Sequence, residues 1–386
     1  MSMDKDEQLQ SIDTTTLTPL VQRATGRPTI ELGDWSLQQI YAGTSDALGL
    51  YRFRGEAVDQ GSSVRWSLVL KALGRPAQPS EPTHWNYWKR EWHAYQSGLL
   101  TDLPGGLKAP SCLAAVEQSG EVVWLWLEDI TEDSHSSWST ADYGNVAYRC
   151  GQFNGIFLTE RPLPTYPWLS RNWIRGFVED NARFVTELSR SLEHPWVKRS
   201  YPSDVAEGLL RTWADRDQYL HTLEGLPQTL CHLDVFRRNV LLWPGLEGEP
   251  ELVLIDWASI GHGALGEELV PLIVASTLFF EVELLDAQEL EGHVFARYLE
   301  GLRDVGWRGD PGLVWLGYAS AAALRYGVGA LMFELPVVLD ERLHPHEERS
   351  FEGRSIVEIL ERWREVNRRF TLRLAHEARA LIDKLG

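Results

Sequence analysis

The sequence changes character once along the chain, near residue 129, and this change limits the folds that the chain can adopt. Before that point, short runs rich in β-branched and aromatic residues are separated by Gly, Ser and Asp turns, a pattern typical of strands. We expect these strands at Trp35–Ala42, Leu48–Arg54, Val64–Leu73, Ser111–Glu117 and Val122–Leu127. One helical pattern, Trp85–Gly98, stands among them, and Thr15–Arg23 could form a short leading helix.

Beyond residue 129 the helical period dominates, interrupted by one expected strand pair around Gln228–Leu242 and Glu251–Asp256. The long helical patterns are Asp142–Leu158, Asn172–Leu188, Asp204–Leu223, Ala287–Leu302 and Val357–Leu385. Strands followed by helices predict an α+β fold, and 386 residues are enough for two lobes. We therefore expect a small β-rich lobe with one main helix over residues 1–129 and a larger, mainly helical lobe over 130–386.

Composition excludes several classes of function. The chain has 37 basic and 55 acidic side chains, a net charge of −18, which argues against binding to nucleic acid or anionic lipid. Too few cysteines are present for a disulfide framework: Cys112, Cys150 and Cys231. The apolar stretches Leu269–Phe280 and Pro311–Leu324 are too short to span a bilayer, so we expect buried helices. The first ten residues lack the apolar core of a signal peptide, and we expect a cytoplasmic protein.

Polar residues cluster where two apolar runs meet, between Leu230 and Leu242. His232, Asp234 and Asn239 stand in this cluster, which suits a loop held rigid by buried flanks. A second apolar run, 253–255, is followed directly by Asp256. A carboxylate at the end of a buried strand is costly unless it is paired or coordinates a metal. Carboxylate and amide oxygens are ligands that Mg²⁺ accepts, with phosphates and waters completing its coordination.

The spacing His-x-Asp-x4-Asn, followed by Ile-Asp-Trp, resembles the catalytic and metal-binding segments of the aminoglycoside phosphotransferase and choline kinase group. This resemblance implies a bilobal, protein-kinase-like fold and phosphoryl transfer. It implies that Asp234 is the catalytic carboxylate that orients the acceptor hydroxyl and takes its proton. It also implies that Asn239 and Asp256 bind Mg²⁺ and that His232 anchors the catalytic loop.

The expected small lobe contains an independent sign of the same chemistry. A single lysine, Lys71, ends the apolar strand 66–70, where it could reach the α- and β-phosphates of ATP or GTP. Glu91, in the expected helix twenty residues later, is placed to hold that lysine as an ion pair. Glu81 is the alternative partner, and we prefer Glu91 because it lies mid-helix. A lone strand lysine is otherwise a surface residue with a buried stem.

Two further nucleotide-binding segments carry less sequence information. By the resemblance, the strand 124–127 runs into a hinge that meets the adenine edge, formed by Glu128, Asp129 and Ile130. The loop between the first two strands lacks a Gly-x-Gly-x-x-Gly pattern. Three of its residues could cover phosphates through amides and hydroxyls, or could form an ordinary hairpin turn: Gly43, Thr44 and Ser45.

The sequence also departs from the protein-kinase pattern. Phe236 stands where protein kinases place a lysine, so Arg237, or alternatively Arg238, could supply charge to the γ-phosphate; a solvated or packing role is equally open. Leu233 occupies a position where many relatives have glycine. No Ala-Pro-Glu activation segment follows, which favours a small-molecule kinase. Glu267 or Glu268 is expected to be an acid in the first turn of a helix.

We expect Mg²⁺-dependent transfer of the ATP or GTP γ-phosphate to a hydroxyl of an aminoglycoside, an amino sugar, or another antibiotic or metabolite. The alternatives are a catalytically inactive nucleotide-binding protein of the same fold and a protein or peptide kinase. Candidates for the acceptor site are Asn172, Trp173, Arg175, Asp286, Trp315, Tyr318, Tyr326, Glu334, Asp340 and Glu341. The negative net charge and 17 tryptophans favour a cationic or neutral acceptor. Arg325 is the counter-example, since it could bind a carboxylate or phosphate.

Overall fold

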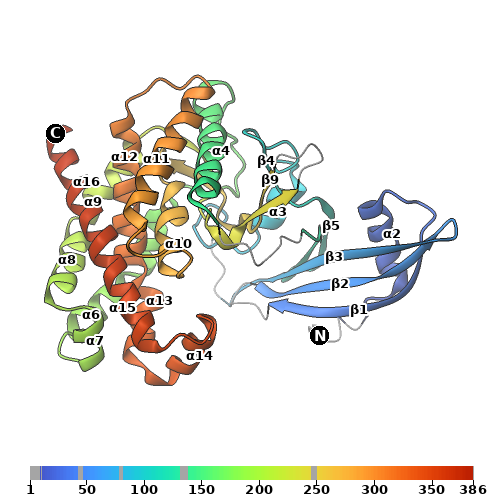
Figure 1. Ribbon diagram of the computed structural model, residues 1–386, viewed down its shortest axis with the longest axis horizontal. Helices are drawn as coiled ribbons and strands as arrows, with labels where there is room; N and C mark the ends of the chain where they lie inside the picture. The colour runs from blue at the N-terminus through green and yellow to red at the C-terminus, as the bar shows by residue number, and fades with distance from the viewer. Residues whose placement is uncertain are drawn as a thin grey trace.

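The computed structural model describes residues 9, 11–41, 47–77, 81–130, 138–244 and 250–385. A β-sheet with one covering helix extends to one side of a larger helical region (Figure 1), which confirms the predicted α+β, protein-kinase-like architecture. The elements of the first part are α2 (Thr14–Thr25), β1 (Glu31–Tyr41), β2 (Ala47–Asp59), β3 (Ser62–Gly74), α3 (Arg90–Gln96), β4 (Leu107–Lys108), β5 (Cys112–Ser119) and β6 (Val122–Glu128).

The sheet of the first part has the antiparallel order β1-β2-β3-β6-β5. Along β3 the side chains alternate as a strand requires: Trp66, Leu68 and Leu70 are buried in a core that includes α2, whereas Val69 and Lys71 line a cleft. The first three strands extend beyond the predicted ranges, because backbone pairing continues through the polar ends of the hairpins.

The helix predicted at Trp85–Gly98 is shorter in the structure, where α3 spans Arg90–Gln96. Arg90 explains this difference. Its fully buried guanidinium donates hydrogen bonds to the carbonyls of Trp85 (2.8 Å) and Pro82 (3.3 Å), and so holds the preceding residues in turns. It also donates to the carbonyls of Trp168 (3.0 Å) and Ala258 (2.9 Å), which ties α3 to the second part of the chain.

The second part contains short strands among helices. Its elements are α4 (Thr140–Thr159), α5 (Trp173–Asp180), α6 (Ala182–Arg190), α7 (Pro195–Ser200), α8 (Ser203–Ala214), α9 (Arg216–Gly225), β7 (Gln228–Cys231), β8 (Val240–Pro244), β9 (Pro250–Leu254), β10 (Gly261–Ala264), α10 (Ser276–Leu278), α11 (Ala287–Asp304), α12 (Pro311–Ala322), α13 (Leu331–Leu339), α14 (His344–Ser350), α15 (Ile356–Val366) and α16 (Leu372–Leu385). Two predicted helices are each divided in two, at Asn181 and at Asp215, where the backbone leaves the helical conformation.

The predicted strand pair is also rearranged. The segment Gln228–Leu242 supplies two strands, of which β7 pairs with β10 and β8 pairs with β9. The two-residue β4 pairs in parallel with β9, so the first part of the chain contributes to this second region. The proposed lobe boundary at residue 129 therefore stays a prediction. The loop between β7 and β8 carries the polar cluster recognised in the sequence.

The predicted helix at Pro311–Leu324 is part of a longer helical stretch, Pro311–Leu339, in which a π-helical turn at Ala323–Gly329 joins α12 to α13. By length and composition alone this stretch could cross a membrane, but 67% of its most apolar window is buried inside the protein. Packing of this kind is expected for a central helix of a helical lobe.

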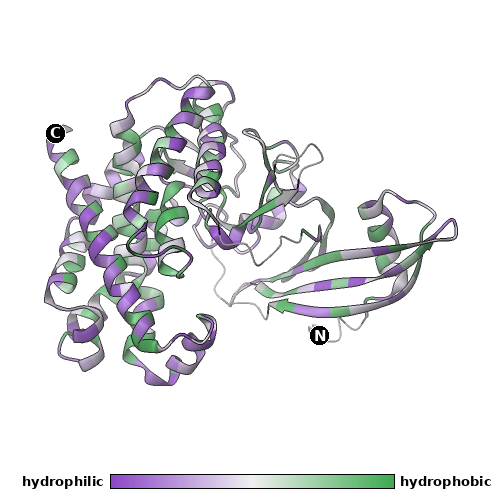
Figure 2. Ribbon diagram, in the orientation of Figure 1, coloured by the Kyte–Doolittle hydropathy of each residue, from purple (hydrophilic) through white to green (hydrophobic). Residues whose placement is uncertain are grey.

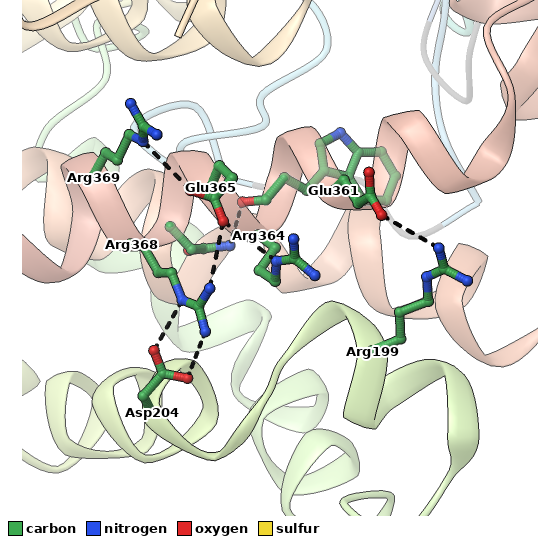
Figure 3. A network of polar contacts seen from close by, with 9 residues as sticks. Arg199, Asp204, Glu361, Arg364, Glu365, Arg368 and Arg369 are labelled. Atoms are coloured by element: carbon green, nitrogen blue, oxygen red, sulfur yellow. Dashed lines mark hydrogen bonds and ion pairs between the residues drawn. The ribbon is translucent and has the colours of Figure 1, made fainter. Parts of the chain in front are cut away.

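Polar contacts hold the outer helices of this part together. Arg368, in the turn between α15 and α16, donates two hydrogen bonds of 2.9 Å to Asp204 on α8, and Arg199 pairs with Glu361 at 3.3 Å (Figure 3). In Figure 2, α15 and α16 carry hydrophilic residues on the visible side. Exposed ion pairs of this kind contribute about 0–1 kcal/mol each, so the apolar interior supplies most of the stability.

Candidate active site

A cleft of about 900 Å³ opens between the sheet and the helical part. Residues of the sheet and residues that follow β7 and β9 line it together. Seven of the residues singled out in the sequence are among them: Lys71, Glu91, Glu128, Asp129, Ile130, Asn239 and Asp256. The volume is in the range of small-molecule and cofactor sites. Gly43, Thr44 and Ser45 lie outside the described residues.

Lys71 lies between two carboxylates in this cleft. Its Nζ is 2.5 Å from Glu91 Oε2 and 2.8 Å from Asp256 Oδ1, so the predicted ion pair with Glu91 is present. Burial lowers the pKa of Lys71, but the charges of Asp256 and Glu91 outweigh this effect and hold the pKa above its usual value. Lys71 is therefore a permanent cation. Glu81, the alternative partner, is exposed.

His232 is fully buried beneath the loop that follows β7. Its Nδ1 accepts a hydrogen bond from the backbone N–H of Asp234 (3.2 Å), so Nε2 carries the proton and donates to the carbonyl of Ile255 (3.0 Å). Burial lowers the pKa of His232 to about 4, which keeps the ring neutral. The ring also packs edge-on against Trp257. These contacts join the loop to the segment that carries Asp256.

Leu233 adopts a left-handed conformation, with φ of 67°, although it is neither glycine nor exposed. Glu268 accepts hydrogen bonds from the backbone N–H groups of His232 (2.8 Å) and Leu233 (2.9 Å). Arg325 donates to the carbonyl of Leu233. Contacts on both sides of Leu233 thus hold a backbone conformation that ordinarily favours glycine. Glu268 lies just before its helix and binds this loop. From the sequence we expected an acid in the first turn of the helix, so this contact was missed.

The carboxylate of Asp234 has two neighbours that fix its orientation. Arg325 Nη2 lies 2.7 Å from Oδ1, and Asn239 Nδ2 donates to Oδ2 at 2.9 Å. Burial raises the pKa of Asp234, whereas Arg325 and Asn239 lower it. Arg325 is itself stacked between Trp173 and Tyr326, with its guanidinium 4.5 and 5.3 Å from their ring centres.

Asn239 and Asp256 offer oxygen atoms to the same cleft. The amide nitrogen of Asn239 also donates to the backbone carbonyl of Asp234 (3.0 Å), which fixes the side-chain amide so that Oδ1 is left as an acceptor. Asp256 has φ of 62°, and its side chain is 44% exposed. Within the described ranges, no cluster of three or more His, Cys, Asp or Glu could hold a metal alone. One carboxylate and one amide fit Mg²⁺, which takes few protein ligands and completes its shell with phosphates and water.

The expected hinge begins at Glu128, the last residue of β6, which lines the cleft. Its backbone N–H donates to the carbonyl of Ser111 at 2.9 Å, and its Oε2 accepts a hydrogen bond from the backbone N–H of Ser111 at 3.2 Å. Asp129 accepts two hydrogen bonds from Arg52, at 2.7 and 3.0 Å, and one from Ser67. The side chain of Asp129 thus fastens the hinge to β2 and β3, so only its backbone remains for a ligand.

The two arginines after Phe236 point to different places. Arg238 lines the cleft and pairs with Glu281 at 2.8 Å. Arg237 lies outside the cleft lining, with its guanidinium over the ring of Trp138 at 4.6 Å. The structure therefore brings Arg238, the alternative in the sequence, closer to the other candidate residues, and the role of Arg237 stays a prediction.

The comparison of the sequence with known families agrees with this geometry. Residues 93–305, more than half of the chain, match the family model described as the phosphotransferase enzyme family. The chain belongs to the phosphotransferase enzyme family. This assignment confirms the resemblance seen in the catalytic-loop motif. A search of curated proteins found no match.

Solved structures with similar folds include further phosphotransferases. Amicoumacin kinase hAmiN, in complex with AMP-PNP, Ca²⁺ and Ami, has a TM-score of 0.52 and 16% identity over 95% of this chain and 96% of that one. The gentamicin complex of APH(2")-IIa has a TM-score of 0.45 and 11% identity over 97% and 99%. APH(3'')-Id from Streptomyces rimosus has a TM-score of 0.39 and 16% identity over 81% and 99%. At these identities the likeness to hAmiN shows the fold.

Within this family fold, only some candidate acceptor residues approach the catalytic loop. Trp173 and Tyr326 do so through Arg325, as described above. The others do not line the cleft: Asn172, Arg175, Asp286, Trp315, Tyr318, Glu334, Asp340 and Glu341. Several are engaged in contacts of their own; Tyr318 donates to Glu291, for example, and Arg175 pairs with Glu224.

Three residues of the site have no recognisable sequence signal. Glu268 and Arg325 act on the catalytic loop from 35 and 91 residues away in the sequence, and Arg90 joins α3 to Ala258 over 168 residues. A buried charge in an apolar stretch was the one available hint, and it identified Arg325 as unusual without indicating its partner.

Proposed function

We propose that this member of the family transfers the γ-phosphate of ATP or GTP to a hydroxyl of a small molecule in the presence of Mg²⁺. The observation that carries the proposal is the assembly around one loop. Lys71, Glu91 and Asp256 are joined on the nucleotide side, and Asp234 is oriented by Arg325 on the other. Phosphoryl transfer depends mostly on positioning and electrostatic stabilisation of this kind.

In the proposed reaction, Asp234 orients the acceptor hydroxyl and takes its proton as the oxygen attacks the γ-phosphorus. The new O–P bond forms, the bond from the γ-phosphorus to the bridging oxygen breaks, and the nucleoside diphosphate leaves. Arg325 favours the ionised form of Asp234, since burial raises the pKa of this carboxyl group and the charge of Arg325 lowers it. His232 is neutral and holds the loop rather than transferring a proton.

Lys71 is proposed to hold the α- and β-phosphates, with Glu91 fixing the position of its ammonium group. Asn239 and Asp256 would hold Mg²⁺, which when bound neutralises phosphate charge. The backbone of 128–130 would meet the base. Arg238, rather than the predicted Arg237, is proposed to face the γ-phosphate, because it lines the cleft. Use of ATP agrees with the expected cytoplasmic residence.

The test is a coupled assay of ADP release over a library of hydroxylated small molecules, aminoglycosides and amino sugars included. With a verified acceptor, Asp234→Asn should lower kcat by about 10²–10⁴-fold, as loss of a general base does, and should change nucleotide affinity little. Asp234 variants with near-normal kcat would contradict the assignment. Nucleotide binding without Asp234-dependent turnover of any acceptor would favour the inactive kinase-like alternative, and turnover of peptides alone would favour a protein kinase.

A further inference from the structure

A second cavity, of about 340 Å³, lies beside the catalytic loop. Three arginines, three phenylalanines and two glutamates line it. Arg238 borders both this cavity and the nucleotide cleft. Phe236, two residues after Asp234, lines the cleft and contacts the ring of Phe279 in the cavity, with ring centres 5.7 Å apart. A molecule in this cavity would therefore lie next to the loop that carries Asp234.

The charge of the lining is opposite to that of the whole protein. Three arginines face two glutamates, an excess of one positive charge, whereas the chain as a whole carries −18. Arg238 pairs with Glu281. Arg354 is exposed and forms no salt bridge among the described residues, although its charge acts on Glu358. Its guanidinium lies 4.3 Å from the ring centre of Phe280. An arginine held on an aromatic ring and without a salt bridge can bind an anion.

The apolar part of the lining is aromatic. The rings of Phe279 and Phe351 stack with centres 5.7 Å apart and an angle of 24° between their planes, and Phe280 meets Phe351 edge-on at 5.8 Å. The guanidinium groups of Arg354 and Arg362 lie 4.3 and 4.2 Å from the ring centre of Phe280, so protein groups already contact the faces of this ring. The cavity thus combines a cationic group with the edges of aromatic rings.

The backbone at this cavity is strained in two places. Phe280 and Glu352 have φ of 63° and 58°, in the left-handed region that few side chains adopt. Leu233 and Asp256, which flank the proposed reaction centre, have the same feature. Strained residues persist where the surrounding structure fixes them, and they concentrate at functional sites. Two such residues at one cavity agree with a functional role.

We propose that this cavity binds the acceptor and that the acceptor is a hydroxy acid. Its carboxylate would pair with Arg354, its apolar part would pack against the edges of the phenylalanine rings, and its hydroxyl would point to Asp234. The inference rests on the proposed function. It opposes the cationic or neutral acceptor expected from net charge, because charges beyond about 10 Å are screened in salt and the local lining decides.

The experiment measures binding, so that it does not depend on turnover. Calorimetry with protein, AMP-PNP and Mg²⁺ would compare 4-(hydroxymethyl)benzoic acid, its carboxamide and 4-(aminomethyl)benzyl alcohol. We expect the acid to bind at least about tenfold more tightly than either analogue, the effect of one hydrogen-bonded charge. Arg354→Gln should abolish this preference. Arg349→Gln, which removes an exposed charge on α14 outside both cavities, should keep it.

Absent or equal binding of the acid, or tighter binding of the amine, would overturn the inference. A preference for the acid that survives in Arg354→Gln would also overturn it. Added salt should weaken binding of the acid and leave the carboxamide unchanged, which gives a readout that needs no variant. The proposed function is judged separately by Asp234-dependent ADP release. A cationic acceptor in that assay would leave the phosphotransferase in place and remove this inference.

Discussion

Asp234 shows how single neighbours decide what a residue can do. Burial alone raises the pKa of its carboxyl group, which would leave it protonated over a wider range and unable to accept a proton. Arg325, 2.7 Å away, reverses part of that effect and also bonds the carbonyl of the strained Leu233. One arginine therefore sets both the ionisation of the proposed base and the shape of the loop that carries it.

Replacing Arg325 should change the pH dependence of the reaction. In Arg325→Met the pKa of Asp234 rises, since its main compensating charge is lost. A base works only when unprotonated, so activity falls as pH drops through its pKa, and this fall should begin about 1–3 pH units higher in the variant. The measurement is kcat against pH with a verified acceptor.

Arg325→Lys is the matched control, because it keeps the charge but not the two-pronged contact. The fall of kcat at low pH should shift less in Arg325→Lys than in Arg325→Met, while kcat of Arg325→Lys at high pH should still be lower than in wild type. An unchanged pH profile in Arg325→Met would mean that Arg325 packs the loop and does not control the ionisation of Asp234.

At the scale of elements, the long helical stretch from α12 to α13 supplies several of these features. Its π-helical turn carries Arg325 to the catalytic loop. Further along, Glu334 on α13 is buried and accepts a hydrogen bond from Tyr201 at 2.7 Å. Burial raises the pKa of Glu334 to about 7. The sequence suggested an acceptor ligand at this position, and the structure shows a residue of the helical core.

Glu334 should make the stability of this part depend on pH. Because its folded-state pKa lies above the usual value, its contribution to stability is present at low pH and is lost as pH rises through about 7. Glu334→Gln should therefore raise Tm relative to wild type at pH 8 more than at pH 5. Glu300→Gln, an exposed change on α11, is the control and should shift Tm equally at both pH values. If the Tm values of Glu334→Gln and of wild type changed equally with pH, the expected titration of buried Glu334 would be contradicted.

At the scale of the whole molecule, α3 joins the two parts on which the site depends. Adjacent residues of this helix face different partners: Glu91 pairs with Lys71 on the sheet, and Arg90 bonds the carbonyls of Trp168 and Ala258 in the second part. The cleft that contains Lys71 lies between the surfaces that these contacts connect. The geometry at Lys71 therefore depends on a residue that does not reach the cleft.

Arg90→Met should weaken this connection. It leaves the buried carbonyl of Trp168 without this donor, at a cost of about 1–3 kcal/mol, and removes the bonds to partly buried carbonyls as well. Tm should therefore fall and KM for nucleotide should rise together. Thermal unfolding and nucleotide titration measure the two effects. Arg161→Met, which removes an exposed ion pair with Asp102, should change stability by at most about 1 kcal/mol and leave KM alone. A stable Arg90→Met protein with unchanged KM would show that other contacts hold the two parts.

Features that depend on residues close together in the chain could be predicted from the sequence. The period-2 burial of β3, the order of strands before helices and the His-x-Asp-x4-Asn loop each lie within a short window, where backbone geometry fixes which side chains share a face. Lys71 and Glu91 were paired correctly because the kinase-like pattern places a carboxylate of the next helix beside a lysine of the strand. The fold and the family followed from these local patterns.

Only the tertiary structure decided which distant residues complete the site. Asp234 and Arg325 are 91 residues apart, and no period or spacing connects them. Their contact arises because buried charges must find partners once the chain is packed. The same requirement placed Glu268 beneath Leu233 and shortened α3 around Arg90. Sequence determines where polar groups stand along the chain, and packing determines which of them meet.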